Sequence, residues 1–419
     1  MKVLLLNQCF YPDVASTAQH LSDLAVELAG SGHEVTVIAS DRGYDNPAIR
    51  FPRREVWRGI TIIRIPSLAL GKSSKWRRVV NFASFLFVCT WRLLWLRRFD
   101  AVFALTSPPL ISVLGAVFVM TKGGRFISWV MDLNPDEAIA AGWLRRDSLT
   151  ARFLFRLLNF SLKRADRIIV LDRFMKQRIM EKGVTEEKLA VIPPWSHNDR
   201  VAYDREGAAA FRSAHGLAGK FVVMYSGNHS PCHSLDTLLG AARRLEDRED
   251  IAFCFVGGGS EYEKVKLQAR ELRNIVCLPY QPLDSLAMSL SAADVHVVVM
   301  GDAFTGIVHP CKIYNMLEIG SPVLYIGPAT SHVTDVISKL DDQELICSAR
   351  HGDVDTVANY IVAGAKNLAG KRSPAAVKMA STFSKDALLP RIVELIELAP
   401  ELEFKSKAVV AETKAEQLS

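Results

Sequence analysis

The chain has 419 residues, of which 49% are hydrophobic and 23% are charged. This is the composition of a folded protein, and the length exceeds what one hydrophobic core usually spans, so we expect two domains. The net charge of +6 suits phosphate ligands or an anionic membrane surface. It is too small to indicate nucleic acid, and no nucleic-acid-binding motif is present.

The seven cysteines are scattered without the spacing of a disulfide framework, and several lie inside apolar runs. Reduced thiols in the cytoplasm are the simplest interpretation of this usage. The first residues, Met1 to Asn7, lack a long apolar region and a cleavage site, so they predict a first β-strand and no signal peptide.

Short apolar runs alternate with longer helical patterns, such as Ala18–Ala29 and Thr150–Arg164, which is typical of parallel α/β architecture. The first half has seven such runs: Val3–Leu6, Val35–Ala39, Thr61–Ile65, Ala101–Leu105, Phe126–Val130, Arg167–Leu171 and Leu189–Ile192. The second half has six: Phe221–Tyr225, Ala252–Val256, Ile275–Leu278, Val295–Val299, Val323–Ile326 and Glu344–Cys347.

A rigid polar connector, Pro193–Asp199, separates the two halves. We therefore expect one parallel-sheet domain over residues 1–195 and a second over residues 200–382, with the last residues, 403–419, forming a disordered tail. Ligands of such sheets bind outside the carboxyl ends of the strands, so the cleft between the domains is the expected site.

One segment is unusually apolar and aromatic. Val79–Leu96 contains eighteen residues with basic residues at both ends, so that residues 75–98 form a basic and aromatic unit. Two polar residues, Asn81 and Arg92, interrupt the run. Basic residues flank both ends, so there is no charge asymmetry of the kind that orients a transmembrane helix. A transmembrane span is therefore disfavoured. We interpret the segment as an interfacial helix with Trp76, Trp91 and Trp95 at headgroup depth. A helix packed between the sheet and its neighbour is the alternative.

The loop after the first strand, Asn7–Ala18, has no glycine, which disfavours dinucleotide-dependent hydride transfer. Ser16 and Thr17 can cap the next helix, and Asp13 lies at the expected cleft edge, so the loop suits a hydroxyl-rich or phosphate ligand. After the fifth strand, Asp132 begins a polar run that predicts a sugar contact or a base; a capped helix start is the alternative.

Three loops of the second half combine glycines with hydrogen-bond donors. They contain Gly227, Asn228 and His233; then Gly257 and Gly258; and finally Gly306, His309, Cys311 and Lys312 before a helix that ends at Gly320. A helix N-terminus favours anions, and Lys312 adds a full charge there, so the three loops predict a diphosphate cradle. The histidines and cysteines do not have a standard zinc spacing, so no metal site is expected.

With these loops in view, the chain resembles GT-B glycosyltransferases of the retaining family 4 type, especially bacterial cell-surface polysaccharide transferases. The resemblance covers Met1 to about Ala399, and its motifs are specific in their order and spacing rather than singly. They are N-Q-C-F-Y-P-D-V-A-S-T-A-Q-H-L, G-H-E-V-T-V, S-P-P-L, D-L-N-P, Y-S-G-N, H-S-L-D-T-L-L, F-V-G-G-G, L-P-Y-Q-P, S-A-A-D-V and P-C-K followed by G-S-P-V-L.

The resemblance implies two Rossmann-like domains facing across a cleft, and a terminal helix over 383–400 that crosses back to the first. A nucleotide diphosphate sugar, with UDP or GDP, would bind the second domain, and a membrane-held glycan or polyprenyl-linked acceptor the first, near Asp13, Ser16 and Thr17. The sugar would be transferred with retention, without a metal or other cofactor. Catalytic roles fall on Asp132, Lys312 and His309. The donor contacts would be Gly227, Asn228, His233, Gly257, Gly258, Gln281, Gly306, Cys311, Asn315 and Glu318.

The chain departs from the family pattern where many members carry Glu-x7-Glu, because Ile307 and Asn315 occupy those positions. Asn315 or Glu318 would then hold the donor ribose. Two other functions share this architecture: a nucleotide-sugar epimerase, which has no use for the segment 75–98, and a non-catalytic partner subunit, which the missing glutamates suggest. The favoured location is the cytoplasmic face of the plasma membrane, as a peripheral protein.

Overall fold

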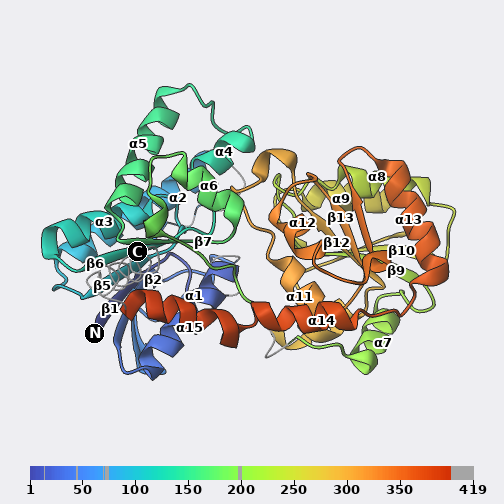
Figure 1. The fold of residues 1–419 in the computed structure, drawn as a ribbon, viewed down its shortest axis with the longest axis horizontal. Coiled ribbons are helices and arrows are strands. Elements are labelled where there is room, and N and C mark those ends of the chain that lie inside the picture. The colour runs from blue at the N-terminus through green and yellow to red at the C-terminus, as the bar shows by residue number, and fades with distance from the viewer. Residues whose placement is uncertain (14, 44–45, 69, 71–74, 197–200, 398–419) are drawn as a thin grey trace, which may run out of the picture.

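The computed structural model describes residues 1–13, 15–43, 46–68, 70, 75–196 and 201–397. The chain forms two lobes that lie side by side, each built on its own sheet with helices on both faces (Figure 1). This confirms the predicted fold class of two α/β domains. Part of the expected connector, residues 197–199, and the expected tail, 403–419, lie outside the described residues.

The sheet of the first domain has eight strands in the order β3-β4-β2-β1-β5-β6-β7-β8. Their bounds are β1 Lys2–Leu6, β2 Glu34–Ser40, β3 Arg54–Trp57, β4 Ile60–Ile65, β5 Ala101–Ala104, β6 Arg125–Trp129, β7 Arg167–Val170 and β8 Leu189–Val191. The helices are α1 Ser16–Gly30, α2 Lys75–Leu94, α3 Ile111–Lys122, α4 Asp136–Ala140, α5 Leu149–Arg164 and α6 Arg173–Met180.

All seven runs predicted in the first half are strands. The additional strand, β3, pairs antiparallel with β4 at the sheet edge, and its residues are partly or fully exposed. A short edge strand with polar residues has no continuous apolar run, which is why the hydrophobic pattern does not reveal it.

The second sheet has six parallel strands in the order β11-β10-β9-β12-β13-β14, all of them predicted. They are β9 Phe221–Asn228, β10 Ile251–Gly258, β11 Ile275–Leu278, β12 Val295–Val299, β13 Val323–Ile326 and β14 Ile346–Ala349. The helices are α7 Arg205–Ala214, α8 Asp236–Arg244, α9 Tyr262–Glu271, α10 Leu286–Ser291, α11 Lys312–Ile319, α12 His332–Ile337, α13 Val354–Asn367 and α14 Pro374–Ala380.

Both sheets reverse their strand order beside the first strand of their domain, at β1/β5 and at β9/β12. Their central strands are buried on both faces, as continuous apolar runs in parallel sheets require. Loops that leave such a reversal point in opposite directions open a crevice at the carboxyl ends of the strands, which is where ligands bind in this class of sheet. The topology therefore places one binding edge on each domain.

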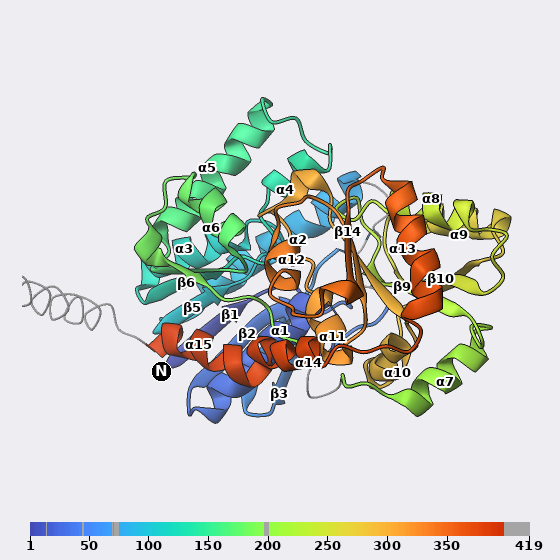
Figure 2. The same ribbon diagram turned by 45° about the vertical axis from the view of Figure 1, so that its right-hand side comes forward.

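The last described helix, α15 Lys385–Glu397, follows the second domain in the chain but packs on the first (Figure 2). Its Leu388, Leu389 and Ile392 belong to the apolar core of the first domain, and the helix contacts α1. Trp195 of the connector donates from Nε1 to Asp23 Oδ2 on α1 at 2.9 Å. The two domains are thus joined by two chain crossings.

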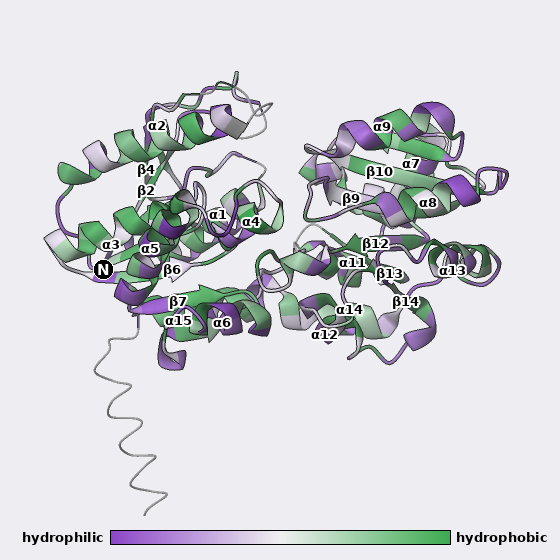
Figure 3. Ribbon diagram, turned by 90° about the horizontal axis from the view of Figure 1, so that it is seen from above, coloured by the Kyte–Doolittle hydropathy of each residue, from purple (hydrophilic) through white to green (hydrophobic). Residues whose placement is uncertain are grey.

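Helix α2 covers most of the segment interpreted above as interfacial. Phe85, Cys89 and Leu93 recur on one face of the helix and are buried in the core of the first domain. The helix lies at the outside of the first domain (Figure 3). Its opposite face exposes large apolar side chains, among them Phe87 at 75% and Trp91 at 61%. Among the described residues, no helix has the length and hydropathy that a membrane crossing needs.

Candidate active site

The three glycine-containing loops of the second domain converge as predicted, because β10, β9 and β12 are neighbours in the sheet. Strands β9 and β10 stay paired to their carboxyl ends, with Gly227 opposite Gly257. Both glycines have positive φ, and a Cβ on Gly257 would lie 2.1 Å from the carbonyl oxygen of Gly227. Side chains at these positions would separate the strands, so the glycines permit the backbone to close the binding edge.

Lys312 begins α11 and points its amine at this edge. The Nζ is buried and has no hydrogen-bond partner among the described residues. It lies 3.7 Å from the centroid of the Tyr225 ring, and a Cβ on Gly227 would lie 3.2 Å from it. Burial lowers the pKa of Lys312 to about 7. An uncompensated buried amine is costly, whereas an anion placed beside it would restore the charge and satisfy its donors.

Two histidines flank the amine. His233 donates from Nδ1 to the carbonyl oxygen of Val299 at 2.8 Å, and His229 packs between the rings of Tyr225 and Tyr262. Burial, with the Lys312 charge, lowers the pKa of His233 to about 3 and that of His229 to about 4. Both imidazoles are therefore neutral at physiological pH, and they add polar groups without adding charge.

The remaining predicted donor contacts have varied surroundings. Asn228 and Gly258 end the paired strands, and Gln281 donates from Nε2 to the carbonyl oxygen of Pro279 at 3.0 Å. Asn315 is half-buried on α11. Glu318 accepts a 2.6 Å hydrogen bond from the Ser196 hydroxyl, so its carboxylate faces the connector. The hydrogen bond to Ser196 thus engages the Glu318 carboxylate at the connector.

The Gly306 loop lies against the first domain. Gly306 has a φ of +70°, and a Cβ there would lie 2.7 Å from the backbone of Phe174. Both ring nitrogens of His309 are engaged, by Asp172 and by Tyr314. Cys311, the N-cap of α11, has its Sγ 3.9 Å from the Ser16 hydroxyl of the first domain. This loop thus brings the Lys312 helix to the facing domain.

On the first domain, Asp132 follows β6 and its N–H donates to Thr106 Oγ1 at 3.4 Å. Burial, and then the nearby Glu137, raises the pKa of Asp132 to about 7. Glu137 belongs to the polar run that begins at Asp132, although no individual role was predicted for it. Its Oε2 accepts from Asn134 at 2.8 Å, and its Oε1 lies 3.9 Å from the Cys232 thiol of the second domain. Two acidic residues five positions apart, Asp132 and Glu137, follow a buried strand, and this pattern was the signal in the sequence for the pair.

The capping role predicted for Ser16 and Thr17 is wrong. Helix α1 begins at Ser16, its N-cap is Ala15, and no side chain caps it, so both residues lie in the first turn. The Ser16 hydroxyl instead pairs with His20 Nδ1 at 3.3 Å, beside Cys311. Asp13 donates its N–H to the Phe10 carbonyl oxygen at 3.0 Å, in a turn at the same edge. The loop therefore faces the Lys312 helix.

Comparison with known proteins agrees with this geometry. Residues 17–195 match the family described as Glycosyl transferase 4-like domain. Over 344 residues the chain is 27% identical to WcaI of Escherichia coli K12, provisionally described as a colanic acid biosynthesis glycosyl transferase, covering 78% of this chain and 84% of WcaI.

Solved structures share the fold at low identity. Sucrose-phosphate synthase from Thermosynechococcus elongatus superimposes with a TM-score of 0.73 at 14% identity, over 94% of this chain and 98% of that one. HepE of Anabaena in complex with UDP-glucose gives a TM-score of 0.68 at 15% identity, over 94% and 99% of the two chains.

Two Rossmann-like domains, each with a binding edge at its strand reversal and joined by a returning C-terminal helix, define the GT-B glycosyltransferases. The sequence matches agree with this class: residues 17–195 match the Glycosyl transferase 4-like domain family, and the chain is a glycosyltransferase.

Proposed function

We propose that this glycosyltransferase transfers a hexose, with retention of configuration, from a UDP- or GDP-sugar to a membrane-held glycan or polyprenyl-linked acceptor in cell-surface polysaccharide biosynthesis. The observation that carries the donor assignment is the buried amine of Lys312 beside Gly227, which has no hydrogen-bond partner in the described part of the chain. The description of WcaI supports the polysaccharide, and the UDP-glucose complex of HepE supports the kind of donor.

In this proposal the diphosphate lies against Lys312 and the free N–H groups at the start of α11. Charge develops on the diphosphate as the glycosidic bond breaks, and these fixed donors stabilise it. The acceptor oxygen attacks from the same face that the diphosphate leaves. Its proton passes to the departing phosphate oxygen, so no strongly basic side chain is needed.

The acceptor would approach from the first domain. Asp132 orients its attacking hydroxyl or the donor sugar, and the turn with Asp13, Ser16 and Thr17 contacts the rest of the acceptor. Ser16 and Cys311 are 3.9 Å apart at their side-chain tips, so the acceptor loop lies close to the donor helix. This closeness is what transfer between two bound substrates requires.

The test is a thermal-shift screen of UDP, GDP and their sugars, followed by product analysis with membrane extracts as acceptor. A nucleotide at about a hundredfold its dissociation constant should add roughly 2.7 kcal/mol to apparent stability. Transfer to lipid-extractable product supports the proposal. An epimerised free sugar would instead identify an epimerase, and binding of no nucleotide would indicate a non-catalytic subunit.

We further propose that α2 holds the enzyme on an anionic membrane surface. Its exposed face carries Trp76 and Trp91, and basic residues flank it in the sequence at both ends. The Arg78 guanidinium lies 5.6 Å from the Trp143 ring, so the aromatic and basic surface continues beyond the helix. Such a surface suits the boundary between lipid headgroups and acyl chains.

Replacing Trp91 and Trp95 with serine should reduce flotation with phosphatidylglycerol-containing vesicles at least fivefold. Both side chains are exposed, so the melting temperature should change little. The matched control is Leu267→Ser, which replaces another exposed large apolar side chain, on α9 of the second domain. Equal flotation of all three proteins, or equal binding to neutral vesicles, would contradict this membrane assignment.

A further inference from the structure

The loop between β12 and α11 belongs to the second domain by sequence but is embedded in the first. Phe304, Ile307 and Val308 are buried within the apolar core cluster of the first domain. The Ile307 carbonyl accepts from the Leu133 N–H at 2.9 Å, and the Thr305 carbonyl accepts from Arg178 at 2.6 Å. The loop therefore anchors one domain in the other immediately before the Lys312 helix.

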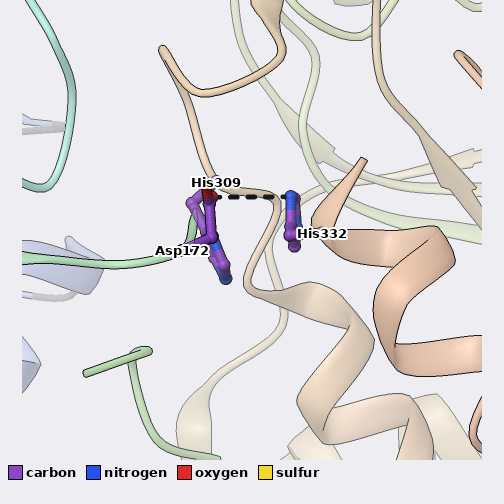
Figure 4. Close-up of side chains that lie close together, drawn as sticks. All are labelled: Asp172, His309 and His332. Atoms are coloured by element: carbon purple, nitrogen blue, oxygen red, sulfur yellow. Dashed lines mark hydrogen bonds and ion pairs between the residues drawn. The ribbon is translucent and has the colours of Figure 1, made fainter. Parts of the chain in front are cut away.

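At the end of this loop, Asp172 of the first domain lies against His309 and His332 of the second (Figure 4). A buried chain of hydrogen bonds runs from Asp172 through His309 to Tyr314. Asp172 follows β7, and its Oδ1 accepts from the Met175 N–H as the N-cap of α6. Its Oδ2 lies 2.8 Å from His309 Nδ1, and His309 Nε2 lies 2.7 Å from the Tyr314 hydroxyl. His309 is buried at the centre of the chain.

The chemistry of the three groups gives the chain a direction. Hydrogen bonds from His309 and the Met175 N–H, with the nearby His332, hold the pKa of Asp172 at about 2 despite its burial, so the carboxylate only accepts. His309 Nδ1 therefore donates to Asp172. The other ring nitrogen, Nε2, pairs with the Tyr314 hydroxyl. Each member has its partner, and the ring orientation is fixed.

Residues of α12 make further contacts beside the hydrogen bonds of Asp172, His309 and Tyr314. His332, which begins α12, stacks on His309 with ring centroids 3.7 Å apart and an interplanar angle of 23°. Asp335 on α12 receives two hydrogen bonds from Arg173 of α6, at 2.5 and 2.9 Å. Helix α6 of the first domain thus contacts both α12 and, through His309, α11.

These residues are not arranged as a metal site, although Asp172, His309 and His332 have ligand chemistry and lie close together. The two imidazole planes are nearly parallel, so their in-plane lone pairs run side by side and do not converge on one point. A metal ion needs convergent lone pairs in addition to short distances between ligands. The arrangement fits hydrogen bonding across the domains.

We infer that Asp172, His309 and Tyr314 are positioning residues that hold the start of α11, and with it Lys312, against the acceptor domain. Tyr314 lies two residues after Lys312 on a single helical turn, so movement of the first domain relative to His309 is transmitted to the diphosphate-binding end of the helix. The inference rests on the proposed donor role of Lys312. None of the three groups contacts substrate in this account.

The deciding variants are His309→Phe and Tyr314→Phe. The first keeps an aromatic ring for the stack but removes both hydrogen bonds, and the second removes one hydroxyl. We expect kcat to fall about tenfold or more for His309→Phe and less for Tyr314→Phe, with the UDP dissociation constant changed less than threefold. Arg173→Gln, which breaks the exposed ion pair and leaves the buried chain, is the matched control and should retain kcat.

A second readout reports domain position without activity. In a Ser16→Cys background, the new thiol lies beside Cys311 across the boundary, and the rate of disulfide formation under a mild oxidant measures how the domains face each other. We expect slower formation when His309→Phe or Tyr314→Phe is added and an unchanged rate with Arg173→Gln. Unchanged crosslinking and kcat in both chain variants would overturn the inference. Failure of UDP to bind the unmodified enzyme would instead refute the donor assignment.

Discussion

Replacement of Lys312 by methionine should lower turnover by a factor of about 10²–10³ and leave a protein that is more stable than the original. Methionine has a similar length without the charge, so the helix start keeps its packing but loses its cation. The rate loss follows from removing a fixed donor at the leaving group. The stability gain follows because the amine is buried without a hydrogen-bond partner among the described residues.

The pH dependence of stability separates these two effects. The pKa of Lys312 is lowered from 10.5 to about 7, so the unfolded chain binds more protons than the folded one between those values. Stability should therefore rise with pH across this window, by at most about 4 kcal/mol, and the methionine variant should lose that rise. Urea unfolding at pH 7 and at pH 9 measures the difference.

Nucleotide binding should shift the protonation of Lys312 in the opposite direction to folding. Above pH 7 the free amine is increasingly neutral, and a bound diphosphate favours its charged form, so UDP binding takes up as much as one proton. Calorimetry at pH 8 in two buffers of different ionisation enthalpy detects this uptake. Lys366→Met, at an exposed lysine of α13, is the control and should behave as the original enzyme. Full turnover in the Lys312 variant would refute the donor site.

Replacement of Asp132 by asparagine should lower turnover about a hundredfold or more, within the range expected for a group that orients or deprotonates a reactant. The pKa of Asp132 is raised from 3.8 to about 7, first by burial and then by Glu137. If the ionised form is the active one, kcat/KM should rise with pH through about 7 in the original enzyme. The variant should lack that step.

The direction in which the stability changes with pH shows whether Asp132 has the raised pKa. A carboxyl whose pKa is raised on folding favours the protonated native state, so its contribution is lost as pH rises from about 4 to 7. Asp132→Asn should therefore be more stable at pH 8, by at most about 4 kcal/mol. Asp136→Asn is the control on the same segment: it breaks an ion pair with Lys182 at 2.8 Å, so it should lose stability and keep activity. A fully active Asp132 variant would exclude its proposed role.

The hydrophobic pattern was sufficient to predict the architecture. Buried parallel strands are continuous apolar runs, so thirteen of the fourteen strands in the described part of the chain were visible as such runs. The neighbouring positions of the Gly227, Gly257 and Gly306 loops followed from the same alternation of strands and helices. The exception, β3, takes its structure from pairing at an edge, where polar residues are tolerated.

The partners of individual side chains were less predictable. Asp172 and His309 are 137 positions apart, and no local spacing indicates that a domain boundary brings them together. The sequence pointed to the same histidine but for a different reason, as a donor to phosphate. Likewise, Ser16 has the side chain of a typical N-cap, yet it is the first residue of α1. The N-cap position is occupied by Ala15.

Segments from the second half of the chain complete the core of the first domain, and this affects the order in which the domains can fold. The core of the first domain includes Ile307 from the middle of the second domain and Ile392 from the final helix. Domains usually fold during synthesis as soon as each is complete, beginning at the N-terminus. Here the core of the first domain is complete only after α15 has left the ribosome, so both domains must complete their folding together.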